Sequence, residues 1–179
     1  MMRVLKSRRG VSPVIATVIL VATAITIAVA VAYWMGGITS QYTRFEKVEI
    51  ISVYCESSSE NYWGTGQDEA CWKITLNLRN TGTTEATIIG VFINGKAIAD
   101  YGANADGYDY IQAYDDSTPP QQVDFSDGDK ITIDPGSSRE LTIVIKQDSS
   151  ALTFTSGTTI ELALHSGAGN SYMKMVTLT

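Results

Sequence analysis

The side chains best suited to catalysis or metal binding are few and widely spaced. His165 is the only histidine, and Cys55 and Cys71 are the only cysteines. A Ser-His-Asp triad would have to be built around His165, which lies in an alternating apolar and polar segment with no nucleophile motif beside it. A structural zinc site needs four ligands, and these three residues are too few. We therefore expect a protein that is not an enzyme and that uses no metal or cofactor.

Calcium is the metal that needs a closer test, because the chain has many aspartates. Asn104, Asp106 and Gly107 resemble part of an EF-hand loop, but Gly102 stands where the first aspartate belongs and Ala113 where the bidentate glutamate belongs. The EF-hand interpretation therefore fails. An irregular calcium site remains an alternative, with ligands drawn from Asp115, Asp116, Asp124, Asp127 and Asp129. Solvated acidic loops are the favoured interpretation of these residues.

The elements that must position these side chains divide the chain into two dissimilar parts. Residues 1–37 hold four basic residues and no acidic ones, and Val11 to Gly37 carries no charge. The remainder holds the other 9 basic residues and all 19 acidic ones. This acidic remainder is large enough to bury its own core, and its charge argues against nucleic acid as a partner.

The uncharged run from Val11 to Gly37 predicts a helix that is apolar on every side. Its 27 residues would extend about 40 Å as a helix, which exceeds a hydrocarbon core of about 30 Å. Ser12 followed by Pro13 predicts the helix start, with the serine side chain as a cap. Gly36 and Gly37 offer a break near the other end, although the pattern resumes weakly toward Phe45. Such a helix needs lipid or other helices around it.

Three interpretations of this run compete: a secretory signal, a permanent membrane anchor, and a segment that serves in the membrane first and in an assembly later. A secretory signal has an apolar region of about 7 to 15 residues with a cleavage site beyond it, so this run is too long. A simple anchor remains an alternative. The permanent anchor and the segment that later enters an assembly are distinguished by the junction before the run. This junction is Arg8-Arg9-Gly10 followed by Val11-Ser12-Pro13.

This junction resembles the class III signal peptide of archaeal type IV pilins. The stretch from Val11 to Ala16 is similar to the start of the mature protein in that family, and Ile15 stands where bacterial pilins usually have glutamate. The resemblance covers about the first 37 residues and favours the adhesion-pilus branch over archaellins. It implies that a prepilin peptidase removes residues 1–10 by cutting after Gly10, with Arg8 and Arg9 as the leader charge.

The resemblance also implies a function. The chain would be a structural subunit that an assembly platform and its ATPase extract from the archaeal cytoplasmic membrane into an extracellular adhesive filament, which is a helical homopolymer of the chain. A minor pilin and a membrane-anchored surface binding module with the same signal are alternatives. The implied parts are a leader, residues 1–10, a hydrophobic helix, residues 11–45, and an extracellular domain, residues 46–179.

The composition of the run is compatible with close packing of such helices. Small residues interleave with larger aliphatic ones and permit close approach of neighbouring helices; they are Ala16, Ala22, Ala24, Ala28, Ala30 and Ala32. Thr17, Thr23 and Thr26 can return their hydroxyls to the helix's own carbonyls. Ordinary transmembrane composition is the alternative explanation for the small residues.

Beyond Lys47 the pattern changes to short alternating runs separated by Gly, Pro, Asn and Asp, which predicts an antiparallel all-β domain. The clearest runs place Trp72, Ile74, Leu76 and Leu78 on one face, and similar runs centre on Ile143 and Leu162. Further strands are predicted at 48–55, 86–93, 108–114, 130–133 and 172–178. About eight strands at this spacing predict an immunoglobulin-like sandwich, so the fold class is α+β, a long helix followed by that sandwich.

Both cysteines lie in this second part, which is outside the membrane if the basic end stays in the cytoplasm. A Cys55–Cys71 disulfide is therefore the favoured prediction, and two free thiols are the alternative. Cys71 is in phase with the polar face of its strand, so the bridge is expected at a sheet edge.

Overall fold

The computed structural model describes residues 12–62, 68–103, 107–147 and 152–179 of the 179. The chain separates into two compact units, Met1–Thr43 and Arg44–Thr179. The first unit contains the single long helix α1, and the second contains all of the strands. Residues 1–11, and with them the predicted leader and cleavage site, lie outside the described residues.

Helix α1 spans Pro13–Tyr42, with proline at its first position as predicted. The predicted side-chain cap is wrong, because the Ser12 hydroxyl makes no capping hydrogen bond. The carbonyl oxygen of Ser12 instead accepts a hydrogen bond from the backbone N–H of Ala16 at 3.1 Å. Proline fixes its own φ and has no N–H to satisfy, so it supports this start without a serine hydroxyl.

The helix continues through Gly36 and Gly37, where a break was expected, and ends at Tyr42. Each glycine costs about 1 kcal/mol relative to alanine within a helix, but elongation is cooperative and helical turns lie on both sides. The hydroxyl of Thr39 donates to the carbonyl of Met35 at 2.8 Å, across this stretch. An unbroken rod of 30 residues therefore replaces the two shorter pieces that the glycines suggested.

The second unit is built from nine strands and one short 3₁₀ helix among the described residues. In chain order they are β1 (Val48–Glu60), β2 (Glu69–Asn80), β3 (Ala86–Ile93), β4 (Lys96–Ala97), η1 (Ile98–Tyr101), β5 (Ile111–Tyr114), β6 (Ile131–Ile133), β7 (Ser138–Lys146), β8 (Thr159–Ser166) and β9 (Ser171–Thr177).

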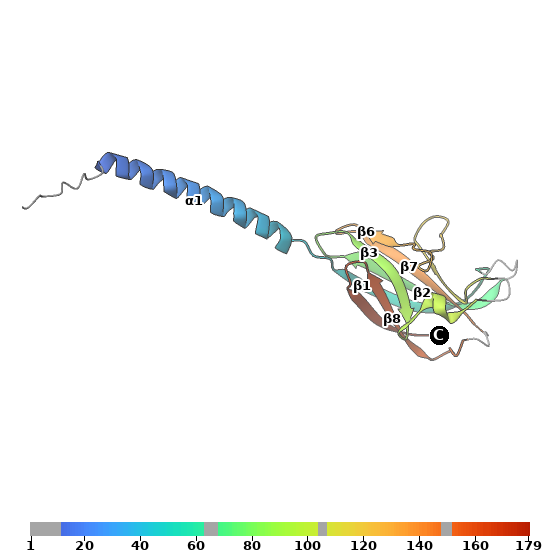
Figure 1. The fold of residues 1–179 in the computed structure, drawn as a ribbon. Coiled ribbons are helices and arrows are strands. Elements are labelled where there is room, and N and C mark those ends of the chain that lie inside the picture. The colour runs from blue at the N-terminus through green and yellow to red at the C-terminus, as the bar shows by residue number, and fades with distance from the viewer. Residues whose placement is uncertain (1–11, 63–67, 104–106, 148–151) are drawn as a thin grey trace, which may run out of the picture. The chain divides into compact units, whose positions relative to one another are not determined.

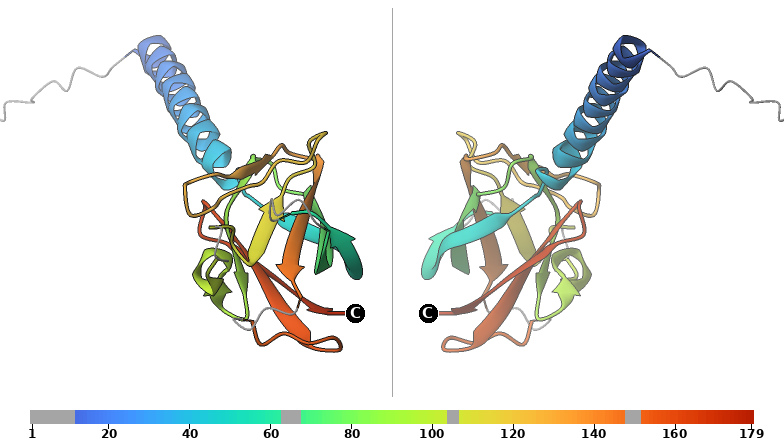
Figure 2. Two further views of the ribbon diagram at one scale, coloured as in Figure 1. Left: turned by 90° about the vertical axis from the view of Figure 1, so that its right-hand side faces the viewer. Right: turned by 90° about the vertical axis from the view of Figure 1, so that its left-hand side faces the viewer.

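These strands form two antiparallel sheets that pack into a sandwich (Figures 1 and 2). One sheet has the order β1-β2-β7-β5, and the other has the order β4-β3-β8-β9, with β6 pairing to β3. In a constant-type immunoglobulin sandwich, strands A, B, E and D form one sheet, and strands C, F and G form the other. The orders β1-β2-β7-β5 and β3-β8-β9 correspond to these two sheets, with β4 and β6 as additions.

The core lies between the two sheets and is made by the inward residues of the alternating strands. Ile74, Leu76 and Leu78 of β2 are fully buried, and the register places Leu141 opposite Leu76 and Ile143 opposite Ile74. Strands β3 and β8 supply the facing layer, including Ile88, Ile93, Ile160, Leu162 and Leu164. The predicted alternation therefore identified the buried face of β2, β7 and β8.

The segment between β3 and β6, which contains Tyr101 and Tyr110, departs most from expectation. The strand expected at 108–114 starts only at Ile111, and the two-residue strand β4 and the helix η1 were not predicted. Tyr101 and Tyr110 pack against the core, and the hydroxyl of Tyr101 donates to the carbonyl of Ile93 at 2.7 Å. Gly and Asp flank these tyrosines in the sequence and predict turns. A turn has no alternating pattern, so the sequence does not show that these side chains point inward.

A set of hydrogen bonds around Asn80 and Gly82, called the clamp below, holds residues 45–47, which lead into β1. Asn80 is fully buried, and its Nδ2 donates to the carbonyls of Thr84 and Ile133 at 2.7 and 2.9 Å. The Oδ1 atom of Asn80 accepts from the N–H of Gly82 at 2.8 Å. The N–H of Gly82 also approaches the carbonyl of Lys47 at 3.2 Å, and a Cβ on Gly82 would lie 2.5 Å from the carbonyl of Phe45. Residue 82 must therefore be glycine for this clamp to form.

Candidate assembly helix and binding face

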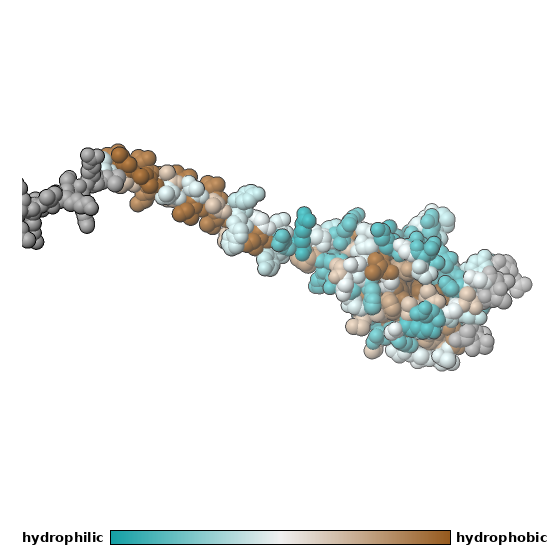
Figure 3. Space-filling view, viewed as in Figure 1, coloured by the Kyte–Doolittle hydropathy of each residue, from teal (hydrophilic) through white to brown (hydrophobic). Residues whose placement is uncertain are grey.

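Helix α1 is the first candidate for a functional surface, because it has no buried residue. Val14, Ile25 and Trp34 are 70%, 60% and 65% exposed; Val14 and Ile25 lie on one side of the helix and Trp34 lies on the opposite side. Figure 3 shows hydrophobic residues gathered over α1 and a mixture of hydrophilic and hydrophobic residues on the visible face of the sandwich. The described helix is long and apolar enough to cross a membrane, with a mean hydropathy of 2.8. Within residues 12–43, the described part of its unit, no surface covers these side chains.

The polar groups inside α1 are satisfied by the helix itself. The hydroxyl of Thr17 donates to the carbonyl of Val14 at 2.8 Å, and that of Thr26 donates to the carbonyl of Ala22 at 2.8 Å. The hydroxyl of Thr23 lies 2.9 Å from the carbonyl of Leu20. The predicted role of the three threonines is therefore confirmed, and their hydroxyls can enter an apolar environment without losing a hydrogen-bond partner.

Four of the small residues of α1 follow a regular spacing. Ala24, Ala28, Ala32 and Gly36 follow one another at intervals of four, so they form one row along an unbroken helix. Among the described residues, a Cβ placed on Gly36 would meet nothing within 4 Å, so nothing in the chain itself requires glycine there. The same row continues backwards through Leu20 to Ala16, whereas Ala22 and Ala30 lie off it. The packing role predicted for the six alanines stays a prediction.

The residues predicted for processing lie outside the described residues. These are the leader charges Arg8 and Arg9 and the cleavage position between Gly10 and Val11. Only the first residues after them, Ser12 and Pro13, are seen, and they begin the helix.

The predicted Cys55–Cys71 disulfide is not present in the structure, where both cysteines are free. The register places Cys55 opposite Ile74, and Cys71 opposite Ser58, so the two lie three positions apart along the β1–β2 ladder. An odd separation puts them on opposite faces of the sheet. Cys55 packs toward the core, and Cys71 is buried on the other face with Val144.

Cys71 marks a small second cluster on the outer face of the first sheet. Tyr62 and Tyr114 cover Cys71 and Val144, with ring centroids 5.0 Å apart and planes tilted by 52°. Burial raises the pKa of the Cys71 thiol, and the nearby Glu60 carboxylate adds to the increase. The thiol is therefore neutral at physiological pH and serves as a packing group. The alternation identified its face, but not the tyrosines that bury it.

His165 also has a packing environment. Its ring stacks on Phe92 with centroids 4.2 Å apart and an angle of 27° between the planes. The pair lies on β8 and β3, where His165 is opposite Gly90 in the register.

The acidic side chains proposed as calcium ligands are used within turns. Oδ1 of Asp124 accepts hydrogen bonds from the N–H and hydroxyl of Ser126 at 2.9 and 2.5 Å, and Asp129 accepts from the N–H of Asp124 at 3.0 Å. The bonds from Ser126 lower the pKa of the Asp124 carboxyl despite its partial burial. Within the described ranges, no group of three or more His, Cys, Asp or Glu side chains could hold a metal ion.

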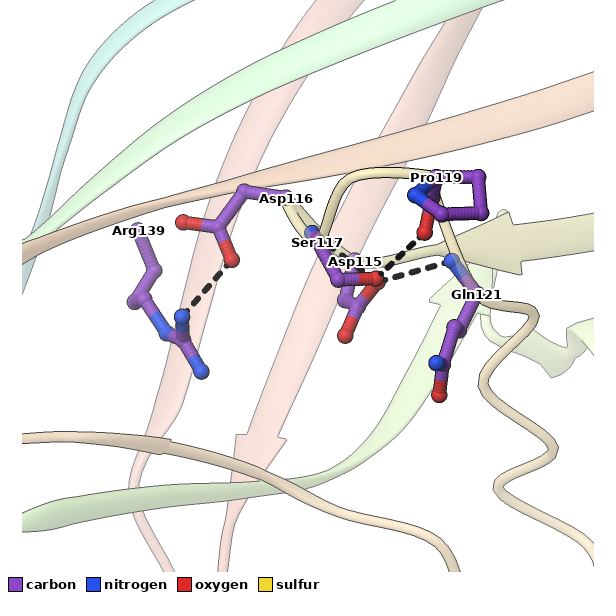
Figure 4. A network of polar contacts seen from close by, with 6 residues as sticks. All are labelled: Asp115, Asp116, Ser117, Pro119, Gln121 and Arg139. Carbon is purple, nitrogen blue, oxygen red and sulfur yellow. Dashed lines mark hydrogen bonds and ion pairs between the residues drawn. The ribbon is translucent and has the colours of Figure 1, made fainter.

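A second acidic turn, residues 115–121, stands beside strand β7 (Figure 4). Oδ1 of Asp115 accepts from the hydroxyl and N–H of Ser117 at 2.5 and 3.2 Å and from the N–H of Gln121 at 2.9 Å. Burial raises the pKa of the Asp115 carboxyl, but these hydrogen bonds outweigh it and keep the pKa below its ordinary value. The neighbouring Asp116 pairs with Arg139 at 2.8 Å.

This turn and the tyrosine cluster border an open cavity of about 480 Å³. Its lining includes Tyr62, Tyr114, Asn77, Thr142 and the Asp116–Arg139 pair. Strands β2, β5 and β7 thus contribute residues to the lining, and the 115–121 turn contributes the others. No motif in the sequence predicts this cavity. Its only signal was an excess of polar residues on the outward positions of strands adjacent in space but distant in sequence.

No family model and no curated protein matches the chain. Among solved structures, an apo PmoF2 PCuAC domain is 14% identical, covering 75% of this chain and 94% of its own, with a TM-score of 0.45. The archaellum periplasmic stator protein FlaG from Sulfolobus acidocaldarius is 13% identical, and the match covers 73% of this chain and 99% of FlaG, with a TM-score of 0.37. A chain of the Iho670 flagellar-like filament is 14% identical, and the match covers 94% of this chain and 99% of the filament chain, with a TM-score of 0.38. With TM-scores below 0.5, none of these likenesses assigns the chain a family.

Proposed function

We propose that the chain is the precursor of an archaeal type IV pilin, a structural subunit of an extracellular adhesive filament. The observation that carries this proposal is helix α1, which is apolar on all sides and has no buried residue along Pro13–Tyr42. Burying one large aliphatic side chain is worth about 1.5 to 3 kcal/mol. The helix therefore requires a continuous apolar environment, which lipid supplies before assembly and sister helices supply afterwards.

The junction in the sequence favours two successive environments over a permanent anchor. In the proposed pathway, a prepilin peptidase cuts after Gly10, and the new amino terminus at Val11 leads directly into the helix that starts at Pro13. Removal of residues 1–10 deletes all four basic residues that precede the apolar run. The charges that hold this end at the cytoplasmic surface are then lost, so the platform and its ATPase can extract the subunit.

The row of small residues supports close packing between sister helices. Glycine at position 36 costs helix stability, and no described neighbour in the chain needs the space. A second helix backbone approaching along Ala24, Ala28, Ala32 and Gly36 would explain why these residues are small. The threonine hydroxyls, which are already bonded within α1, add no polar cost to that contact.

The processing step is tested by replacing Gly10 with valine in cells that express the protein. We expect the unprocessed precursor to accumulate in the membrane, whereas a Ser7→Val variant, three residues upstream, should be cut normally. Amino-terminal sequencing or intact-mass measurement distinguishes the two forms. A mature protein that starts at Val11 in the Gly10 variant would refute the proposed signal.

The assembly step is tested by Ala24→Glu, with Ala24→Gln as a neutral variant of similar size. A carboxylate at the middle of an apolar helix costs about 2.5 to 3.5 kcal/mol on insertion scales and has no partner in a bundle of identical helices. We expect the Glu variant to lose filaments and the Gln variant to retain some of them. Electron microscopy of sheared surface fibres provides the measurement, and abundant normal filaments from the Glu variant would refute assembly through α1.

A minor pilin and an anchored binding module remain the alternatives, and one measurement distinguishes all three functions. Mass spectrometry of purified fibres should identify this chain as their main component if it is a major subunit. A trace amount in fibres made of another protein would indicate a minor pilin. Its presence only in the membrane fraction would favour the binding module.

A further inference from the structure

The cavity on the outer face of sheet β1-β2-β7-β5 has a size and lining that suit a small ligand. Its volume of about 480 Å³ lies within the range of roughly 300 to 1,000 Å³ that is common for small-molecule pockets. The site joins one aromatic wall, one wall of paired charges and a floor that includes Asn77 and Thr142. Each of these parts restricts the chemistry of the ligand.

The aromatic wall is held in place before any ligand arrives. The hydroxyl of Tyr62 donates to Glu60 at 2.7 Å, and the hydroxyl of Tyr114 donates to the side-chain carbonyl of Gln112. Burial raises the pKa of Tyr62 above its ordinary value and that of Tyr114 to about 12. Both phenols are therefore neutral, and their rings offer apolar area at a small cost in conformational entropy.

The charged part of the lining supplies planar hydrogen-bonding groups in fixed positions. Arg139 engages Asp116 through Nη1, and a guanidinium has five N–H donors in all. The Asp115 carboxylate is held by Ser117 and Gln121, so the turn that carries Asp116 is itself braced (Figure 4). On the floor, Nδ2 of Asn77 donates to the hydroxyl of Ser52 at 3.0 Å, which fixes the orientation of the amide.

The balance of charge excludes several classes of ligand. The two cations of the lining are both paired: Arg139 with Asp116 at 2.8 Å and Lys73 with Glu60 at 3.6 Å. A phosphate would therefore find no unpaired cation among the described lining residues and would lie beside carboxylates. A metal ion has no ligand group in the described part of the chain, and the polar walls do not suit a wholly apolar molecule.

We propose that this cavity binds a neutral saccharide unit. A sugar ring has an apolar C–H face that matches the Tyr62 and Tyr114 wall, and its hydroxyls both donate and accept hydrogen bonds. They would meet the carboxylate of Asp116, the guanidinium of Arg139 and the amide of Asn77, which together provide acceptors and donors. An open site of this kind binds with a Kd on the order of 1 mM. Many copies on one filament would multiply such contacts into adhesion.

The site lies within the sandwich and is independent of how α1 is covered, so its test is distinct from the test of filament formation. The mature chain, kept in an amine oxide detergent that contains no sugar, is titrated with glucose, galactose, mannose and N-acetylglucosamine. Saturation-transfer NMR detects weak binding of each. A parallel arm measures retention of the chain on cellulose, chitin and mannan, which distinguishes free sugars from polysaccharides as the source.

We expect at least one saccharide to bind, with affinity reduced about tenfold or more by Tyr114→Ala and by Asp116→Ala. Tyr54→Ala provides the matched control, because Tyr54 is an exposed tyrosine of β1 outside the lining. Asp116 is also exposed, so its variant should fold even if the Tyr114 variant does not. The proposal is overturned if no saccharide binds at about 10 mM, if Asp116→Ala binds as well as the original chain, or if inorganic phosphate binds more tightly than every sugar. Filaments that persist in Asp116→Ala cells would show that loss of sugar binding leaves assembly intact.

Discussion

Helix α1 and the β-sandwich are both rich in aliphatic residues, but they place them in opposite ways. In the sandwich, Leu76, Ile143 and Leu162 are fully buried in a core that the unit makes for itself. In α1 no residue is buried, and large side chains such as Leu20 and Ile27 are more than half exposed. The sandwich therefore buries its own core, whereas the helix forms its secondary structure but buries none of its side chains.

This difference shows which part of the molecule depends on its surroundings. Alternation buries every second residue of a strand against the facing sheet, so the outward face is free to carry polar groups and the cavity. An all-apolar helix has no polar side to present to water, so its stability outside lipid must come from other molecules. Stability measurements on the sandwich and assembly measurements on the helix should therefore respond to different substitutions.

The largest expected effect is on the core. Leu76→Ala removes a fully buried side chain and should lower the free energy of unfolding of the sandwich by about 2 to 5 kcal/mol. Val21→Ala makes a similar truncation in α1 and should change that free energy by less than about 0.5 kcal/mol. Urea unfolding of the detergent-solubilised chain, followed by tryptophan fluorescence, measures both. Equal losses would contradict the separation of the two units.

Asn80→Ala should produce the next largest loss. The variant leaves the carbonyls of Thr84 and Ile133 without the Nδ2 donor that bonds them, and at least one of these bonds is buried. We expect a loss of about 1 to 3 kcal/mol in the same unfolding measurement. Asn77→Ala, three residues earlier on the same strand and less buried, serves as the control and should cost less. An equal cost would mean that the clamp at residues 45–47 does not depend on Asn80.

A smaller, pH-dependent effect should come from Asp115. Its folded pKa lies below the unfolded value of about 3.9, so its contribution to stability is present above that pH and is lost as the pH falls through the folded pKa. Asp115→Asn should cost about 1 kcal/mol at neutral pH and should reduce the fall in melting temperature on acidification. Melting curves of both proteins between neutral and acidic pH provide the test. Parallel pH profiles would show that the hydrogen bonds from Ser117 and Gln121 do not favour the charged carboxylate.

The smallest expected effect comes from reducing agents. Because Cys55 and Cys71 are free and lie on opposite faces of the sheet, dithiothreitol should leave the melting temperature unchanged. Thiol labelling of the denatured chain should find both cysteines reactive. A fall in melting temperature on reduction would show that a disulfide had formed in the isolated protein.

Much of the fold was accessible from residue patterns alone. The alternation around Trp72, Ile143 and Leu162 identified three long strands and their buried faces, because each pattern is repeated over several residues. The short strand β4 and helix η1 were missed because two to four residues carry too little periodicity. The disulfide was predicted from the inferred compartment and the count of cysteines, which contain no information about register. A strand pairing that sets Cys71 opposite Ser58 decides against it.

The sequence by itself determined helix α1 and what it needs, because 27 consecutive uncharged residues require an apolar environment whatever the rest of the chain does. It also supplied the Arg8-Arg9-Gly10 junction on which the processing prediction depends. Only the tertiary structure decided that Tyr62, Asn77, Asp116 and Arg139 line one cavity. These residues come from segments separated by up to 77 positions in the sequence, and a side chain's neighbours across a sheet are set by strand order and register, which no local pattern specifies.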